Sequence, residues 1–259
     1  MVTASAPPTP DGAARDAAVR GARAWGRFLV GFLVLWGVLQ AVATLDPTAR
    51  WGVLLLAAVL VAAVVVEEVF HGVRPRVALR RLGLGRTRAR VLGLAAGVSA
   101  AVLLVYPLTS LVTGATVALR PGWPWLLVGV FALHGLAEEI VWRGYAYRRL
   151  RRGRSFSAAV AWTMPLLAAT HLPILVTSGV AVGLGAMAVA AATSIPLAYL
   201  FETGRGTVWA PAVLHTAIDS FKLVVIPAGA VTTFSLLLVA VSLVVPLLAL
   251  AVPRRVLEA

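Results

Sequence analysis

The chain has 259 residues, of which 60% are hydrophobic and only 13% are charged, and its formal net charge is +13. A soluble globular domain carries about 25% charged residues, so the composition argues against that class. The sequence contains no cysteine, which excludes both a disulfide framework and a thiol nucleophile.

The apolar residues fall in runs of about 20, the length that a helix needs to cross a hydrocarbon core of ~30 Å. These runs do not alternate apolar and polar residues, as the strands of a membrane barrel would. We therefore predict an all-α, polytopic membrane protein of about eight transmembrane helices. The predicted helices span residues 26–45, 51–70, 90–114, 123–147, 156–176, 180–201, 208–225 and 232–252.

The regions outside these helices are short. Residues 1–25 are rich in Ala, Pro and Arg, a composition that favours a disordered basic tail. Residues 26–252 are predicted to form the transmembrane domain, and residues 253–259 a second short tail. The run that starts at residue 26 is long enough to span, so we interpret it as a retained helix and not as a cleaved signal peptide.

The basic residues are distributed unevenly between the predicted loops. Clusters such as Arg74 to Arg90 and Arg148 to Arg154 fall on one side, together with both chain ends. The opposite side holds only Arg50, Arg120 and Lys222. The positive-inside rule then places both termini in the cytoplasm of a multi-pass protein of the cell membrane. Because the arginines flank membrane helices, we expect a lipid bilayer as partner and no nucleic acid.

Several ionisable residues lie inside predicted helices, where burying a charge costs at least ~2.5–3.5 kcal/mol and therefore suggests function. In the fourth helix, His134 and Glu138 are four residues apart, as are Glu139 and Arg143, so each pair shares a helical face. The remaining members of this group are His171 in the fifth helix, and His215 and Asp219 in the seventh.

These side chains limit the possible chemistry. A carboxylate and an imidazole can activate water directly or through a metal, and a second imidazole can stabilise an oxyanion or bind the metal. Glu138, His171, His215 and Asp219 form a reasonable ligand set for one divalent ion such as zinc, although the helical HExxH motif is absent. Water activation without a metal stays open.

Three motifs carry a resemblance to a known family. Residues 138–143 resemble the EExxxR signature of the CPBP family, which includes the Rce1-like CAAX prenyl endopeptidases and the Abi bacteriocin-immunity proteins. The second and third motifs, FxxxH and HxxxN or HxxxD, are similar to residues 167–171 and 215–219. Position 167 is Leu instead of Phe, and position 219 is Asp instead of the amide of the eukaryotic-type enzymes. The resemblance covers about residues 90–245.

The resemblance implies an Rce1-like helical bundle and an intramembrane endopeptidase that uses water as its nucleophile. It implies that Glu138 and His171 activate the water, and that His215 and Asp219 complete the site. Glu139 and Arg143 would orient the first motif. The expected substrate is a membrane-associated peptide or protein, and the sequence does not assign an oligomeric state.

Other polar residues and functions compete with this hypothesis. We expect Glu67, Glu68 and His71 to pair with arginines at the membrane surface, and His134 to be structural or to tune Glu138. The alternative functions are a non-proteolytic immunity or scaffold protein of the same fold, and a proton-coupled transporter. The absence of an internal repeat disfavours the transporter.

Overall fold

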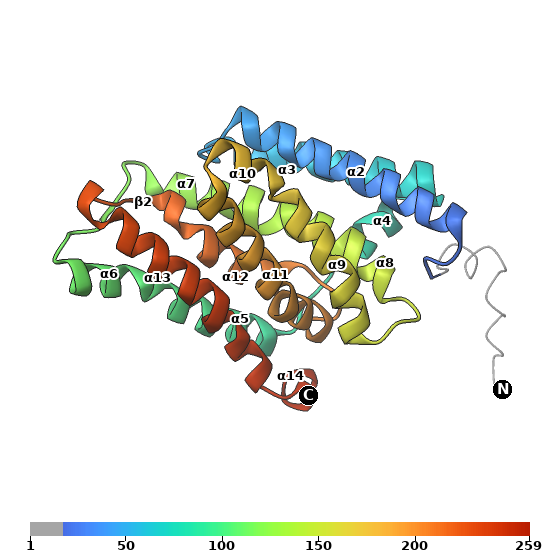
Figure 1. Cartoon of the computed structure of the whole chain (residues 1–259). Helices are drawn as coiled ribbons and strands as arrows, with labels where there is room; N and C mark the ends of the chain where they lie inside the picture. Colours follow the sequence, from blue (N-terminus) through green and yellow to red (C-terminus); the bar gives the residue numbers. More distant parts are fainter. Residues whose placement is uncertain (1–17) are drawn as a thin grey trace, which may run out of the picture.

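A computed structural model describes residues 18–259 of the chain, which are almost entirely helical (Figure 1). The α-helices are α2 (Ala22–Leu45), α3 (Gly52–His71), α4 (Pro75–Arg81), α5 (Ala89–Leu103), α6 (Val105–Thr113), α7 (Trp123–Val130), α8 (Arg148–Arg151), α9 (Phe156–Thr170), α10 (Leu172–Thr177), α11 (Val180–Thr203), α12 (Trp209–Ile218), α13 (Val231–Val244) and α14 (Arg254–Glu258). The π-helices η1 (Phe131–Ala137) and η2 (Ile140–Tyr147) interrupt the fourth predicted helix. Three 3-10 helices, η3 (Asp219–Leu223), η4 (Ala228–Ala230) and η5 (Val245–Ala251), and two short strands, β1 (Ala118–Leu119) and β2 (Val224–Val225), complete the described chain.

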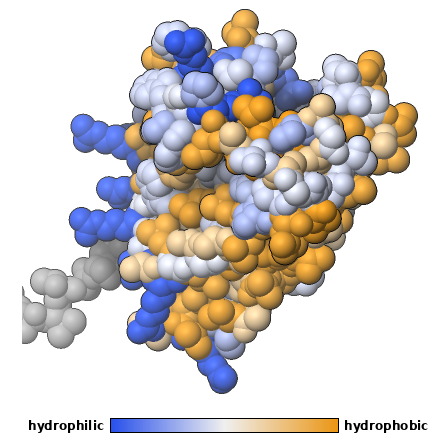
Figure 2. Space-filling model, turned by 90° about the vertical axis from the view of Figure 1, so that its left-hand side faces the viewer, coloured by the Kyte–Doolittle hydropathy of each residue, from blue (hydrophilic) through white to orange (hydrophobic). Residues whose placement is uncertain are grey.

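Within residues 18–259, seven helical segments are long and apolar enough to cross a membrane. Large hydrophobic side chains are exposed along most of these segments, as expected for a surface that contacts lipid. Figure 2 shows this hydrophobic surface, with long hydrophilic side chains protruding from its margin. The protein is therefore a multi-pass membrane protein. The seven segments span 22–45, 52–71, 89–113, 123–151, 156–177, 180–203 and 228–251.

The eighth predicted helix, residues 208–225, is shorter than expected because α12 ends at Ile218 and gives way to η3. It nevertheless runs from one end of the bundle to the other. The backbone N–H of Val208 donates to Gly83 at one end, and Lys222 donates to the carbonyl of Pro47 at the other. α12 packs against α5, α11 and η1, so protein and not lipid surrounds it. In that environment irregular backbone at membrane depth is tolerated.

The contacts place the two ends of the described chain on the same face of the bundle. Arg154 donates to the carbonyl of Val19, near the start of α2, while Arg254 in α14 pairs with Glu202 at 2.7 Å. The paired strands β1 and β2 lie at the opposite end from α8 and α14 (Figure 1). The seven long segments and α12 together cross the bundle an even number of times, which agrees with both ends lying on one face. The assignment of this face to the cytoplasm stays a prediction.

Part of each segment predicted as a tail is helical. Residues 1–17 lie outside the described part of the chain, but α2 begins at Ala22, four residues inside the predicted tail. The C-terminal residues form α14, in which Leu257 is buried. These segments are ordered because they pack on the basic end of the bundle, a tertiary contact that composition does not reveal.

The two glutamates of the fourth helix lie at a change in its winding. Glu138 and Glu139 stand between η1 and η2, and π-helical winding is found frequently at functional sites. Gly135 in η1 allows α12 to approach closely, since a Cβ at this position would lie 2.5 Å from the Thr216 hydroxyl and 3.0 Å from the Ala212 carbonyl oxygen. Because Gly135 has no side chain, η1 and α12 can pack close together.

Candidate active site

The fourth helix supplies two glutamates that have different partners. Glu138 Oε1 lies 2.8 Å from Nδ1 of His134, one turn earlier. Glu139 Oε1 accepts a hydrogen bond of 2.7 Å from Arg143, and both of these side chains are almost completely buried. The spacing of four residues thus produces both pairs that the sequence suggested. One glutamate is held by a guanidinium, and the other faces imidazoles.

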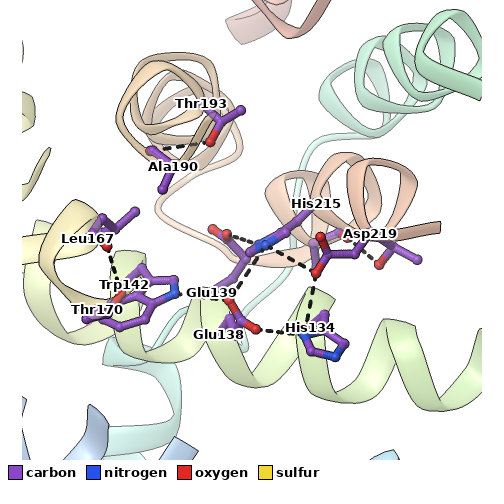
Figure 3. A network of polar contacts seen from close by, with 12 residues as sticks. His134, Glu138, Glu139, Trp142, Leu167, Thr170, Ala190, Thr193, His215 and Asp219 are labelled. Atoms are coloured by element: carbon purple, nitrogen blue, oxygen red, sulfur yellow. Dashed lines mark hydrogen bonds and ion pairs between the residues drawn. The ribbon is translucent and has the colours of Figure 1, made fainter. Parts of the chain in front are cut away.

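α12 brings His215, and the start of η3 brings Asp219, against the two glutamates (Figure 3). His215 Nδ1 lies 2.7 Å from Glu139 Oε1, and its other nitrogen, Nε2, lies 3.7 Å from Glu138 Oε2. The same Nε2 is 4.0 Å from Asp219 Oδ2, which also lies 3.4 Å from Nδ1 of His134. The imidazole of His215 therefore stands between the two glutamates, with one nitrogen towards each.

The cluster combines burial with a limited opening. The side chain of Glu139 is fully buried, whereas those of Glu138 and Asp219 are 22% and 20% exposed. The paired Glu139 and Arg143 can therefore act as a fixed scaffold. Glu138 and Asp219 remain reachable by a small molecule such as water.

His171 lies at a break between α9 and α10 and is partly buried. Its Nδ1 is 2.9 Å from the carbonyl oxygen of Leu167, which is compatible with Nδ1–H donating and Nε2 remaining free to accept. Pro173 has no backbone N–H and so contributes to ending the regular hydrogen-bond pattern of the helix. His171 is close enough to Glu138 to interact with it electrostatically, but it contacts none of the other site residues at hydrogen-bond distance.

The metal-ligand set differs from the predicted one. In the described chain, potential ligand atoms of His134, Glu138 and Asp219 all lie within 4.8 Å of one another. One imidazole nitrogen and two carboxylate oxygens suit zinc or another first-row divalent ion. The predicted ligands His171 and His215 are not in this group. His171 lies at the helix break, and Nδ1 of His215 is engaged by Glu139.

Two residues of the cluster were not among the predicted site residues. His134 was expected to be structural or to tune Glu138, yet it contacts both Glu138 and Asp219. The spacing of four residues gave the first contact, but only the fold brings in Asp219. The indole N–H of Trp142 also points to Glu138 Oε2 at 3.4 Å, which is the limit of a hydrogen bond.

The acidic residues at the end of α3 are separate from this cluster. Glu67 pairs with Arg149 at 2.7 Å, and His71 contacts the hydroxyl of Tyr145. Pairing of Glu67 with an arginine was expected, and this pair is present. Both side chains are buried where α3 meets α8. Glu68 is exposed.

Comparison with known proteins identifies the segment that holds the site. Residues 120–221 match the Rce1-like family of type II CAAX prenyl endopeptidases. Residues 120–221, which are similar to this family, are called the Rce1-like segment below. The Rce1-like segment runs from the loop before α7 to η3, and it therefore includes all the residues of the cluster together with His171. Comparisons with curated proteins and with solved structures found no match.

Proposed function

We propose that the chain is an intramembrane endopeptidase in which Glu138 activates a water molecule for attack on a peptide bond. The observation that carries the proposal is the gap of 3.7 Å between Glu138 Oε2 and His215 Nε2. This distance is too long for a direct hydrogen bond, and such gaps are commonly bridged by a water. The Rce1-like segment supports protease chemistry over the other uses of a buried carboxylate.

The residues around this gap have complementary roles in the proposed reaction. Glu138 takes a proton from the water as its oxygen bonds to the substrate carbonyl carbon, giving a tetrahedral oxyanion. The carbon–nitrogen bond then breaks, and Glu138 returns the proton to the leaving amine. Glu139, fixed by Arg143, accepts from Nδ1–H of His215 and so directs Nε2 towards the reacting water. His171 and Asp219 complete the polar surroundings.

A cavity whose lining includes the sequence neighbours of His215 and Asp219, but not the site residues themselves, favours an apolar substrate. It has a volume of about 460 Å³ and is lined by Thr216 and Ser220, which adjoin His215 and Asp219, and by apolar side chains that include Leu103 and Leu127. Apolar walls with few polar groups favour a hydrophobic segment of a membrane-associated peptide or protein. The substrate class proposed here is therefore broader than prenylated proteins.

The test compares purified wild type with Glu138→Gln, His215→Gln and the matched control Glu68→Gln in lipid vesicles. A library of membrane-associated peptides is incubated with each, and new termini are identified by mass spectrometry. Because a general base contributes ~10²–10⁴-fold, we expect Glu138→Gln to lose cleavage by that order while the control keeps it. Cleavage that Glu138→Gln retains in full, or no cleavage by folded wild type, would contradict the proposal and favour a scaffold or immunity role.

A further inference from the structure

We infer that His134, Glu138 and Asp219 form a binding site for one divalent metal ion of the zinc type. The inference deepens the proposed function, because this site would share Glu138 with the proposed water-activating pair. Compared with the ligand set predicted from the sequence, this site adds His134 and leaves out His171 and His215. The potential ligand atoms come from two helices and converge within 4.8 Å.

The charge of the cluster favours a bound cation. Glu138, Glu139 and Asp219 are three carboxylates, and Arg143 is the cation paired within the cluster. With neutral imidazoles the cluster would carry a net charge of about −2 in a membrane interior, where an unbalanced charge costs several kcal/mol. One divalent ion would neutralise this charge.

Protonation of both His134 and His215 is the alternative way to balance this charge. An imidazolium has two N–H donors and needs two acceptors when it is buried. Nδ1 of His134 faces two carboxylates, but its Nε2 is buried and has no hydrogen-bond partner among residues 18–259. A charged His134 would therefore leave one donor without an acceptor. A neutral His134 that binds a cation through Nδ1 also carries its hydrogen on Nε2, but the unpaired donor is then uncharged and costs less to bury.

The distances between the donor atoms also suit a single ion. Ligand atoms that share one tetrahedral zinc at ~2.1 Å lie roughly 3.4 Å apart. The separation of His134 Nδ1 from Asp219 Oδ2 is 3.4 Å, and that from Glu138 Oε1 is 2.8 Å. Small side-chain shifts would then suffice to seat the ion. The partial exposure of Glu138 and Asp219 leaves a route for it to enter.

The test measures metal binding directly, independently of cleavage. Purified protein is stripped with a chelator and titrated with Co²⁺, a spectroscopic substitute for Zn²⁺, and the ligand-field absorption is recorded. We expect one bound ion per chain in wild type and in His171→Gln. In His134→Gln the affinity should fall by more than the roughly 10–100-fold that loss of an outer-shell partner costs.

A second variant keeps the inference testable if His134→Gln fails to fold. Because the natural chain has no cysteine, His134→Cys introduces a single thiol. A thiolate-to-cobalt charge-transfer band in this variant would show that position 134 ligates the ion. Absence of that band in folded His134→Cys, no Co²⁺ binding by wild type, unchanged affinity in His134→Gln, or an equal loss in His171→Gln would overturn the inference.

The outcomes also separate this site from the proposed protease activity. A protein that cleaves peptides but binds no Co²⁺ would overturn the metal site and leave the proposed function standing. A protein that binds Co²⁺ through His134 but cleaves nothing would support the metal site and contradict the proposed function.

Discussion

Arg143 is the residue on which the order of the cluster depends most directly. Its guanidinium pairs with Glu139, which in turn holds Nδ1 of His215. Removing a cation from a buried pair leaves the partner carboxylate uncompensated, and this costs more than the pair itself contributes. The arginine of the EExxxR motif thus stabilises the fold as well as the geometry of the site.

We expect Arg143→Ala to lower the free energy of unfolding by about 3–5 kcal/mol, because Glu139 would remain buried without its cation. Thermal unfolding of the purified protein in detergent measures the effect. The control is Arg50→Ala, since the side chain of Arg50 is exposed and most exposed substitutions stay within about 0.5 kcal/mol. Equal stability of the two variants would show that the Arg143–Glu139 pair does not contribute to the stability of the fold.

At this scale the sequence predicted a large part of the cluster, because its contacts follow from spacing. His134–Glu138 and Glu139–Arg143 are neighbours on any helix, whatever surrounds it. The role of His134 was missed since its second partner, Asp219, comes from another helix. The position of His171 along the membrane normal could not be predicted, because it depends on the break between α9 and α10. Hydropathy gives no signal for such a break.

At the scale of the elements, the site lies where regular α-helical winding is interrupted. The two glutamates stand between π-helical segments, His171 lies between α9 and α10, and Asp219 begins η3. Hydropathy predicted the long helices well: residues 51–70 and 180–201 correspond to Gly52–His71 and Val180–Thr203. The interruptions depend on tertiary packing, and the apolar pattern therefore contains no signal for them.

The close approach of η1 and α12 at Gly135 provides a test of this arrangement. In Gly135→Ala the new methyl group would overlap with the Thr216 hydroxyl and press on the Ala212 carbonyl, so either the Thr216 side chain or the helices must shift. We expect a loss of stability of about 1–3 kcal/mol, as for overpacked cores, together with reduced cleavage. Thermal unfolding and the peptide assay measure these effects.

The matched control is Gly93→Ala in α5, where a Cβ would meet nothing within 4 Å. This variant should be as stable as wild type or slightly more stable, since alanine has the higher helix propensity. If Gly135→Ala behaved like Gly93→Ala, the approach of η1 to α12 would not limit the site.

For the whole molecule, the distribution of arginines predicted that both ends of the chain share one face, and the contacts of Val19 and Arg254 agree with that arrangement. Which face meets the cytoplasm follows only from the positive-inside rule. The absence of cysteine makes the question accessible, because single cysteines can be introduced at exposed positions at either end.

We expect Thr116→Cys, in the exposed loop before β1, to react with a membrane-impermeant maleimide on intact cells. Ala259→Cys, at the C-terminus, should react only after the cells are opened, since the basic end of the bundle faces the cytoplasm. The opposite pattern would invert the topology, and labelling of both residues on intact cells would contradict a single orientation.

The brevity of α12 has a consequence for the order in which the protein is made. Its 10 helical residues are too few to enter a bilayer as an independent segment, which takes about 20. We expect residues 207–224 alone to fail in a membrane-insertion assay, and to settle into place only among helices that are already inserted. A nascent chain would then lack His215 and Asp219 beside its glutamates until most of its synthesis is complete. Efficient insertion of the isolated segment would contradict this order of assembly.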